Sequence, residues 1–171
     1  MLSKPTPNEY PKFYHTYIKL LEDENLEILL HQQAKELTTL LSSISEEQWN
    51  FRYEPGKWSV KELVGHLIDN EIIMHYRLIH ISRGDEKPIS GYNQEKYIAA
   101  SNYHTYSPDQ LINYYKNVRQ TTLFTMKGIT DEQWLRTGKI NEGYQISARA
   151  IAYIIVGHEL HHLKVLKEKY I

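Results

Sequence analysis

The sequence predicts an all-α protein, an antiparallel helix bundle, from two observations. Four long segments repeat apolar residues at spacings of three and four, and no segment shows a convincing strand pattern. The 171 residues are 41% hydrophobic and 24% charged, as in an ordinary globular protein. At this length we expect one domain, spanning residues 1–171.

The first amphipathic segment covers residues 20–41 and predicts a long helix. Its leucines gather on one face, at Leu26, Leu29, Leu30, Leu37, Leu40 and Leu41. Residues 45–48 predict a short capped turn, and the Tyr-Glu-Pro-Gly stretch at 53–56 breaks the chain before the next element.

The second helix has a well-defined start. Ser59 and Glu62 have the spacing of a capping box, in which each side chain bonds a free backbone amide of the other. The apolar pattern continues to residue 83, and Gly84 stops it after about 25 residues, or roughly 37 Å. Residues 84–92 predict a loop, and residues 93–100 are a candidate short helix.

Similar signals bound the other two helices. Residues 107–110 supply a Ser cap, a Pro at the first helical position and a Gln at the third, and this helix runs to Lys127 and ends at Gly128. Residues 135–145 contain glycines without helical period and predict a loop or a small hairpin. Ser147 then begins the last helix.

Two histidines interrupt the apolar stripe of that last helix. The stripe steps by four and three through Ile151, Ile155, His158, His162, Val165 and Lys169. Since this is the inward seam of a bundle helix, His158 and His162 take positions where apolar side chains are expected.

Two short stretches recur in the chain. Residues 46–49 (Glu-Glu-Gln-Trp) return as residues 131–134 (Asp-Glu-Gln-Trp), and residues 64–66 (Val-Gly-His) return as residues 156–158. This echo favours a two-fold arrangement in which each half supplies one helix pair. Chance is the alternative, because only two short stretches match.

Composition narrows the function classes. The formal charge is −1, from 20 basic and 21 acidic residues, which disfavours nucleic acid or anionic lipid as the main partner. The chain has no cysteine, so any metal must be held by nitrogen and oxygen ligands. The sequence contains no apolar stretch of about 20 residues and no apolar core of a signal peptide at its start, so we expect a cytoplasmic protein that does not bind membranes.

The spacing of His158 and His162 suits a metal ion. Residues four apart on a helix lie about 40° out of alignment, so both imidazoles can reach one cation. His66 lies in the apolar stripe of the second helix and, like His158, follows a glycine. Three buried imidazoles are costly unless their nitrogens find partners, and one divalent cation satisfies all three. The alternative is that core histidines simply form hydrogen bonds with their neighbours.

The remaining histidines fit this site less well. His161 competes with His162, which we favour because the seam continues through Val165. His75 faces the other side of the second helix, and His80 lies about 21 Å from His66 along its axis. The others have no partner pattern and are expected to be solvated: His15, His31 and His104.

The run His158–Glu159–Leu160–His161–His162 also matches the H-E-x-x-H signature of zinc proteases. Only nine residues follow His162, too few for the distant third ligand of thermolysin-like enzymes. In the metzincin pattern the third ligand would be Glu168, but Val165 replaces the glycine that turns the chain there. A protease is therefore disfavoured.

Two segments together resemble the DinB-like (YfiT-type) metalloprotein superfamily. The first is Pro-Gly-Lys-Trp-Ser-Val-Lys-Glu-Leu-Val-Gly-His-Leu-Ile-Asp at 55–69, and the second is Gly-His-Glu-Leu-His-His at 157–162. The similarity covers nearly the whole chain. It implies an up-down-down-up four-helix bundle and a divalent ion held by His66, His158 and His162.

The resemblance implies a metal-dependent hydrolase, or a transferase or isomerase that uses a low-molecular-weight thiol. On this hypothesis the open position of a three-histidine metal activates a thiol or water, with a small-molecule electrophile as partner. Imidazole suits zinc, nickel, iron or copper, and we expect zinc, nickel or iron. The alternative is a non-catalytic metal-binding, ligand-sensing or stress-related protein. A homodimer is compatible with the sequence, which shows no interface.

Two carboxylates are candidates for moving the proton, Glu159 beside one ligand and Asp69 three residues after another. Either could instead orient a ligand imidazole, or lie on a solvated face in a surface ion pair. Tyr92, in the loop after the second helix, is a candidate to cover the site, although a structural role is the ordinary expectation for a tyrosine in this chain.

Overall fold

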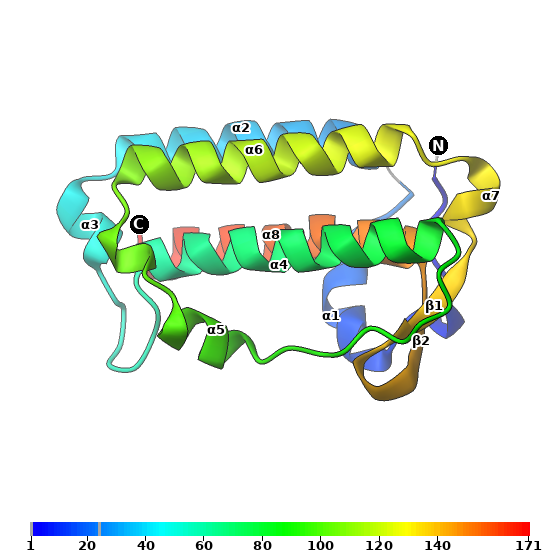
Figure 1. Cartoon of the computed structure of the whole chain (residues 1–171). Helices are drawn as coiled ribbons and strands as arrows, with labels where there is room; N and C mark the ends of the chain where they lie inside the picture. Colours follow the sequence, from blue (N-terminus) through cyan, green and yellow to red (C-terminus); the bar gives the residue numbers. More distant parts are fainter. Residues whose placement is uncertain (1, 24) are drawn as a thin grey trace.

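Four long helices form the frame of the molecule, which is seen in a computed structural model that describes residues 2–23 and 25–171. They are α2 (Leu26–Ser43), α4 (Val60–Ser82), α6 (Pro108–Lys127) and α8 (Ala148–Lys169). In Figure 1, α2 and α8 run in one direction while α4 and α6 run in the other. The predicted all-α, up-down-down-up bundle is confirmed.

The packing order of the four helices follows from their contacts. Helix α4 packs against α6 and α8, and α2 packs against the same two helices. Because α4 and α6 are parallel, the chain between them must return along the bundle. It does so through the predicted loop, helix α5 (Gln94–Ala100) and the 3₁₀ turn η3 (Tyr103–Thr105), which lie along α4 in Figure 1.

Three of the four long helices begin where the sequence predicted, directly after a capping serine. Ser59, Ser107 and Ser147 each accept a hydrogen bond from a backbone amide in the first turn of α4, α6 and α8. The prediction for the first helix was wrong at its start. Helix α2 begins at Leu26, because the Asn25 side chain caps it by accepting from the Ile28 amide. Glu24, also in the predicted range, lies outside the described residues.

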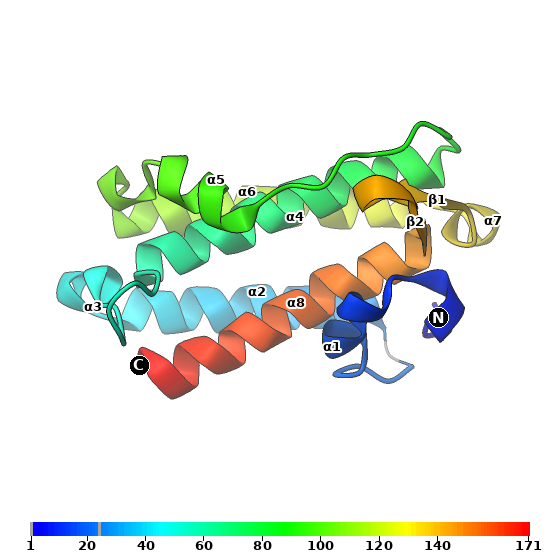
Figure 2. The same ribbon diagram turned by 90° about the horizontal axis from the view of Figure 1, so that it is seen from below.

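The short elements lie at the ends and on one side of the bundle. The N-terminal segment forms η1 (Pro7–Glu9), η2 (Lys12–Tyr14) and α1 (His15–Ile18), and α1 packs on α8. Figure 2 shows α1 beside α8 on the side away from α6. The two repeated tetrapeptides both open capped short helices, α3 (Glu46–Asn50) and α7 (Asp131–Trp134), each with a buried tryptophan.

A hairpin precedes α8, as one of the two sequence alternatives expected. Strands β1 (Thr137–Ile140) and β2 (Tyr144–Ser147) pair antiparallel around the turn η4 (Asn141–Gly143). The loop after α4 is attached to this hairpin, since the Ile89 amide donates to the Lys139 carbonyl and the Asn141 amide donates to the Ile89 carbonyl, both at 2.9 Å.

The core consists of two apolar clusters, one at each end of the bundle. One contains Met74, Leu78 and the first turns of α8, and the other contains Leu63, Leu67 and the last turns of α8. Buried polar side chains separate them, including His66, Glu71, Arg119, His158 and Glu159. Because buried polar groups need hydrogen-bond or charged partners, the polar layer in the middle of the bundle is the candidate functional site.

None of the helices in the described ranges is long and apolar enough to cross a bilayer.

Candidate metal centre

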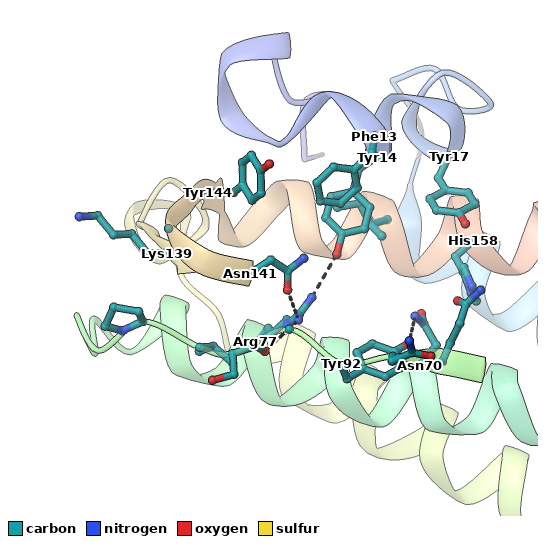
Figure 3. A pocket seen from close by; sticks show the side chains of 18 of the residues that line it. Phe13, Tyr14, Tyr17, Asn70, Arg77, Tyr92, Lys139, Asn141, Tyr144 and His158 are labelled. Carbon is teal, nitrogen blue, oxygen red and sulfur yellow. Dashed lines mark hydrogen bonds between the residues drawn. The ribbon is translucent and has the colours of Figure 1, made fainter. Parts of the chain in front are cut away.

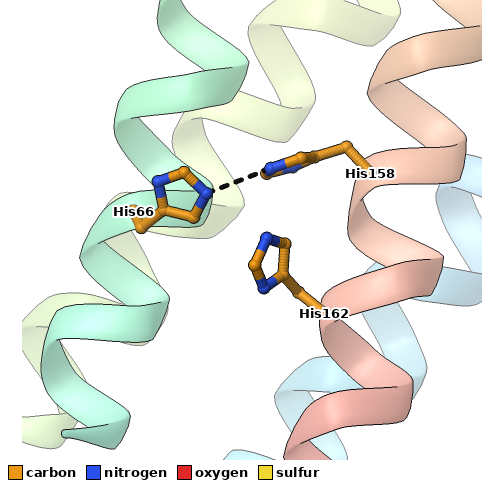
Figure 4. A group of neighbouring side chains, drawn as sticks. All are labelled: His66, His158 and His162. Atoms are coloured by element: carbon orange, nitrogen blue, oxygen red, sulfur yellow. Dashed lines mark hydrogen bonds between the residues drawn. The ribbon is translucent and has the colours of Figure 1, made fainter. Parts of the chain in front are cut away.

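The three predicted histidines come together between α4 and α8. Their candidate ligand nitrogens all lie within 4.8 Å of one another, and the Nε2 atoms of His66 and His158 are 3.0 Å apart. Figure 4 shows the rings of His158 and His162 reaching from α8 toward His66 on α4. The structure thus brings together the set of residues that the sequence singled out. That they bind a metal remains a prediction.

Burial keeps the three imidazoles neutral near pH 7. His66 is 1% exposed and His158 is 5% exposed. Burial lowers the pKa of His66 to about 4. Burial, with the neighbouring His66 and His161, lowers the pKa of His162 to about 3. Burial and the adjacent His162 and His66 likewise lower the pKa of His158 well below its ordinary value. Neutral imidazole is the form that binds a metal ion.

The geometry of the cluster fits a divalent cation. Two nitrogens bound to one ion at 2.0–2.1 Å with bond angles near 90–109° lie about 2.8–3.4 Å apart. The 3.0 Å between the Nε2 atoms of His66 and His158 falls within that interval. Among the described residues the Nδ1 atom of His162 is buried and has no hydrogen-bond partner. Nitrogen ligands of this kind suit zinc, nickel, iron or copper.

Two glycines allow other segments to close over the cluster. A Cβ atom on Gly65 would lie 2.2 Å from the Tyr103 ring, and one on Gly157 would lie 2.5 Å from the Tyr17 carbonyl oxygen. Because these positions carry no side chain, Tyr17 packs edge-on against His158 with ring centres 5.2 Å apart. In both copies of the Val-Gly-His sequence, the glycine therefore allows a tyrosine-containing segment to pack closely on the helix beside a histidine of the cluster.

The other histidines lie elsewhere. His161 is exposed on α8, with its ring against Tyr17 and His162. His75 hydrogen-bonds Thr125 and His80 hydrogen-bonds the Lys87 carbonyl. The three histidines without a partner pattern are exposed, as expected: His15, His31 and His104.

Glu159 points away from solvent, so the surface alternative considered for it was wrong. It is 2% exposed. One carboxylate oxygen accepts from the Tyr115 hydroxyl at 2.7 Å and the other accepts from Arg119. Arg119 also donates to both oxygens of Glu71 at 2.8–3.2 Å and to the Leu30 carbonyl. Since both Glu159 oxygens are engaged, these contacts favour a structural role, and the catalytic role stays a prediction.

Asp69 is half-buried one turn after His66. It accepts a hydrogen bond of 2.6 Å from the Tyr103 hydroxyl. Burial raises the pKa of its carboxyl group, although the Tyr103 hydrogen bond opposes that shift. Asp69 therefore lies beside the cluster with a hydrogen-bond partner of its own, and the catalytic role predicted for it is untested.

A pocket of about 1290 Å³ reaches His158 from the hairpin side of the bundle. Its wall combines α4, the loop after α4, the N-terminal segment and the β1–β2 turn, and aromatic side chains are frequent in it (Figure 3). Tyr92 lines this pocket and accepts a hydrogen bond of 2.8 Å from the Asn70 amide, so it lies where the sequence analysis expected a covering residue.

Sequence reasoning missed two groups of polar residues. The first group lines the pocket and consists of Arg77 on α4 and Asn141 in the turn η4, neither of which belongs to a recognisable sequence motif. The signal for Arg119 was present in the sequence, because it lies four residues after Tyr115 and three before Thr122, within the inward stripe of its helix. A charge in that stripe requires a buried counter-charge, which Glu71 and Glu159 provide.

Comparison with known proteins places the chain in a family. The model of the DinB superfamily matches residues 29–166. A protein of Oceanobacillus iheyensis, provisionally named a metal-dependent hydrolase, is 24% identical over 147 residues, covering 81% of this chain and 83% of that protein.

Solved structures share the fold. YfiT from Bacillus subtilis, described as a probable metal-dependent hydrolase with an unusual four-helix bundle topology, superposes with a TM-score of 0.75 at 19% identity, covering 84% of this chain and 82% of its own. A mycothiol-dependent maleylpyruvate isomerase superposes with a TM-score of 0.64 at 17% identity, covering 81% of this chain but 58% of its own. With a family match over most of its length and this bundle topology, the chain belongs to the DinB superfamily.

Proposed function

We propose that this protein is a metal-dependent enzyme, a thiol S-transferase or a hydrolase, with a divalent cation held by His66, His158 and His162. The observation that carries the proposal is the convergence of three neutral imidazoles, two buried and that of His162 half-buried, beside a pocket that reaches His158. A relative named as a metal-dependent hydrolase and a structural neighbour named as a mycothiol-dependent isomerase support the class.

A three-histidine set leaves part of the coordination sphere free. Structural zinc sites are closed by four protein ligands, whereas catalytic sites use three and keep a position for water or substrate. When bound, a divalent cation in such a site lowers the pKa of a water or thiol at that position, so that a nucleophile forms near neutral pH.

Aromatic residues of the chain pack on two of the imidazoles and hold their rings in place. Trp58 packs on His66 with ring centres 4.7 Å apart, and Tyr17 packs on His158. Asn70 and Tyr92 line the pocket, where a substrate would approach His158. Asp69 is our candidate to accept or return a proton.

The test is a transfer assay on the purified, metal-loaded protein. Monochlorobimane serves as the electrophile with a panel of cellular thiols, and p-nitrophenyl acetate tests hydrolysis. We expect turnover above the uncatalysed rate that His158→Ala abolishes and His161→Ala, changing an exposed neighbour, retains. A protein that binds metal but is inert toward both kinds of substrate would contradict the enzyme proposal and favour a non-catalytic metal-binding or ligand-sensing role.

A further inference from the structure

Arg77 is a buried cation on the wall of the pocket. It is 1% exposed and lies on α4, and the groups that it contacts by hydrogen bonds are neutral. Its guanidinium donates to the Tyr14 hydroxyl at 3.1 Å, to the Asn141 side-chain oxygen at 2.7 Å and to the Ser90 carbonyl at 3.4 Å. One further contact, at 3.6 Å, joins it to the Met74 sulfur.

The charge of Arg77 is not balanced. Among the side chains that the structure describes, which leave out that of Glu142, no carboxylate pairs with it, and its Nε atom is buried without a hydrogen-bond partner. The other fully buried arginine, Arg119, is by contrast paired with two glutamates. A buried charge without a counter-charge destabilises the fold, so its presence on a pocket wall indicates a ligand that supplies the missing negative charge.

The surrounding turn is built around this guanidinium. Asn141 adopts φ 46°, the left-handed region that asparagine and aspartate tolerate better than most residues. In this conformation its side-chain oxygen lies against Arg77, as the dashed lines in Figure 3 show. The same turn is held to the loop after α4 by the backbone hydrogen bonds of Ile89. The arginine is therefore fixed in place before a ligand arrives.

The position of Arg77 sets the length of the ligand. Its Cα lies 11 residues after His66 on one helix, or about 16 Å along the axis. Its side chain leans back toward His66, because it contacts Met74 one turn earlier. A molecule that touches both Arg77 and the imidazole cluster must therefore span on the order of 10 Å.

We propose that Arg77 is the anion-binding end of this pocket and that the substrate is an elongated organic carboxylate, whose carboxylate pairs with the guanidinium while its other end reaches His158. The substrate part of this inference rests on the proposed function. A carboxylate is favoured over a phosphate because one guanidinium balances one negative charge. The aromatic side chains between the two ends, which include Tyr14, Tyr17 and Tyr92, suit an apolar or aromatic body.

The test measures binding of benzoate, its uncharged analogue benzamide and inorganic phosphate to the purified full chain by NMR titration. We expect benzoate to bind the wild type more tightly than benzamide or phosphate. Arg77→Met should weaken benzoate binding by about ten- to a hundred-fold, the range for charge-assisted hydrogen bonds. Arg52→Met removes an equal charge from the exposed partner of a surface ion pair with the half-buried Glu62, and should leave binding unchanged.

A second variant tests the site without removing the arginine. Asn141→Asp places a carboxylate at the atom that already accepts from Arg77, and aspartate tolerates the same backbone conformation. The new side chain should neutralise the guanidinium internally. We expect a higher melting temperature together with a loss of benzoate binding comparable to that of Arg77→Met. This result would stand even if Arg77→Met did not fold.

His66→Ala separates this inference from the proposed function. Benzoate should still bind to this variant, because its site is at Arg77 and not at the histidines. Loss of benzoate binding in His66→Ala, unchanged binding in Arg77→Met or Asn141→Asp, no binding to the wild type, or equal or tighter binding of benzamide or phosphate would each overturn the proposal. Absence of metal from the wild type would instead refute the proposed function and leave the benzoate result intact.

Discussion

The buried charge network around Arg119 allows a quantitative prediction of stability. Arg119 is 2% exposed and is the shared partner of Glu71, which is 5% exposed, and of Glu159. Replacing Arg119 with Met preserves most of the side-chain volume but leaves two buried carboxylates without a cation. Removing one partner of a buried ion pair costs about 3–5 kcal/mol. We expect Arg119→Met to lower the free energy of unfolding by that amount.

Urea denaturation followed by circular dichroism measures this loss. With an m-value of about 2 kcal/mol/M, the midpoint should fall by about 1.5–2.5 M urea. The matched control is Lys164→Met, which removes a cation from an exposed ion pair with Glu168 on α8. Exposed pairs of this kind contribute about 0.5 kcal/mol or less, so the control midpoint should hardly move.

A triple variant tests whether charge is the cause. Replacing Glu71, Arg119 and Glu159 together with Met removes the unpaired carboxylates as well, and should recover part of the stability that Arg119→Met loses. A loss below about 1 kcal/mol in Arg119→Met would refute the reasoning. So would a triple variant less stable than the single one.

Three further predictions concern the histidine cluster. Because the pKa values of His66 and His162 are lowered to about 4 and about 3 by burial, the unfolded chain binds more protons below pH 6.5. The free energy of unfolding of the metal-free protein should therefore fall as the pH is lowered from 6.5 to 4, with each imidazole contributing up to about 1.4 kcal/mol per pH unit. Urea titrations that give the same free energy of unfolding across this pH range would contradict the prediction. Gly157→Ala should lower the free energy of unfolding by about 1–3 kcal/mol in the same assay, because the new Cβ would lie 2.5 Å from the Tyr17 carbonyl oxygen. The control is Gly128→Ala, whose Cβ would have its nearest neighbour at 3.6 Å and which should be as stable as the wild type. Equal stability of the two variants would argue against close packing of α1 on α8. Protein treated with a chelator should be less stable than protein in excess metal, by about 2.7 kcal/mol when the metal concentration is 100 times its dissociation constant. An unchanged melting temperature would count against a bound ion.

Most of the frame could be predicted because its signals are local. Ser59, Ser107 and Ser147 cap their helices through side-chain bonds that a sequence pattern encodes directly. The start of α2 was misjudged because leucines and acidic residues continue the helical pattern upstream, while the decisive cap is Asn25. The spacing of apolar residues shows which face of a helix is buried, but it carries less information about the residue at which the helix begins.

The candidate metal residues could also be predicted, because histidines in an apolar stripe are conspicuous. The pocket could not. Arg77 and Asn141 are far apart in sequence and meet only because the loop after α4 is joined to the β1–β2 hairpin. Contacts that depend on how loops pack leave no periodic signal in the chain.

Metal stoichiometry tests the central claim most directly. We would measure metal bound per chain by elemental analysis after loading and desalting, for the wild type, His66→Ala, His158→Ala, His162→Ala and the neighbouring exposed His161→Ala. We predict about one ion per chain in the wild type and in His161→Ala, and almost none in the other three variants. Metal content that stays the same in all five proteins, or that is lost only in His161→Ala, would contradict a cation held by these three imidazoles.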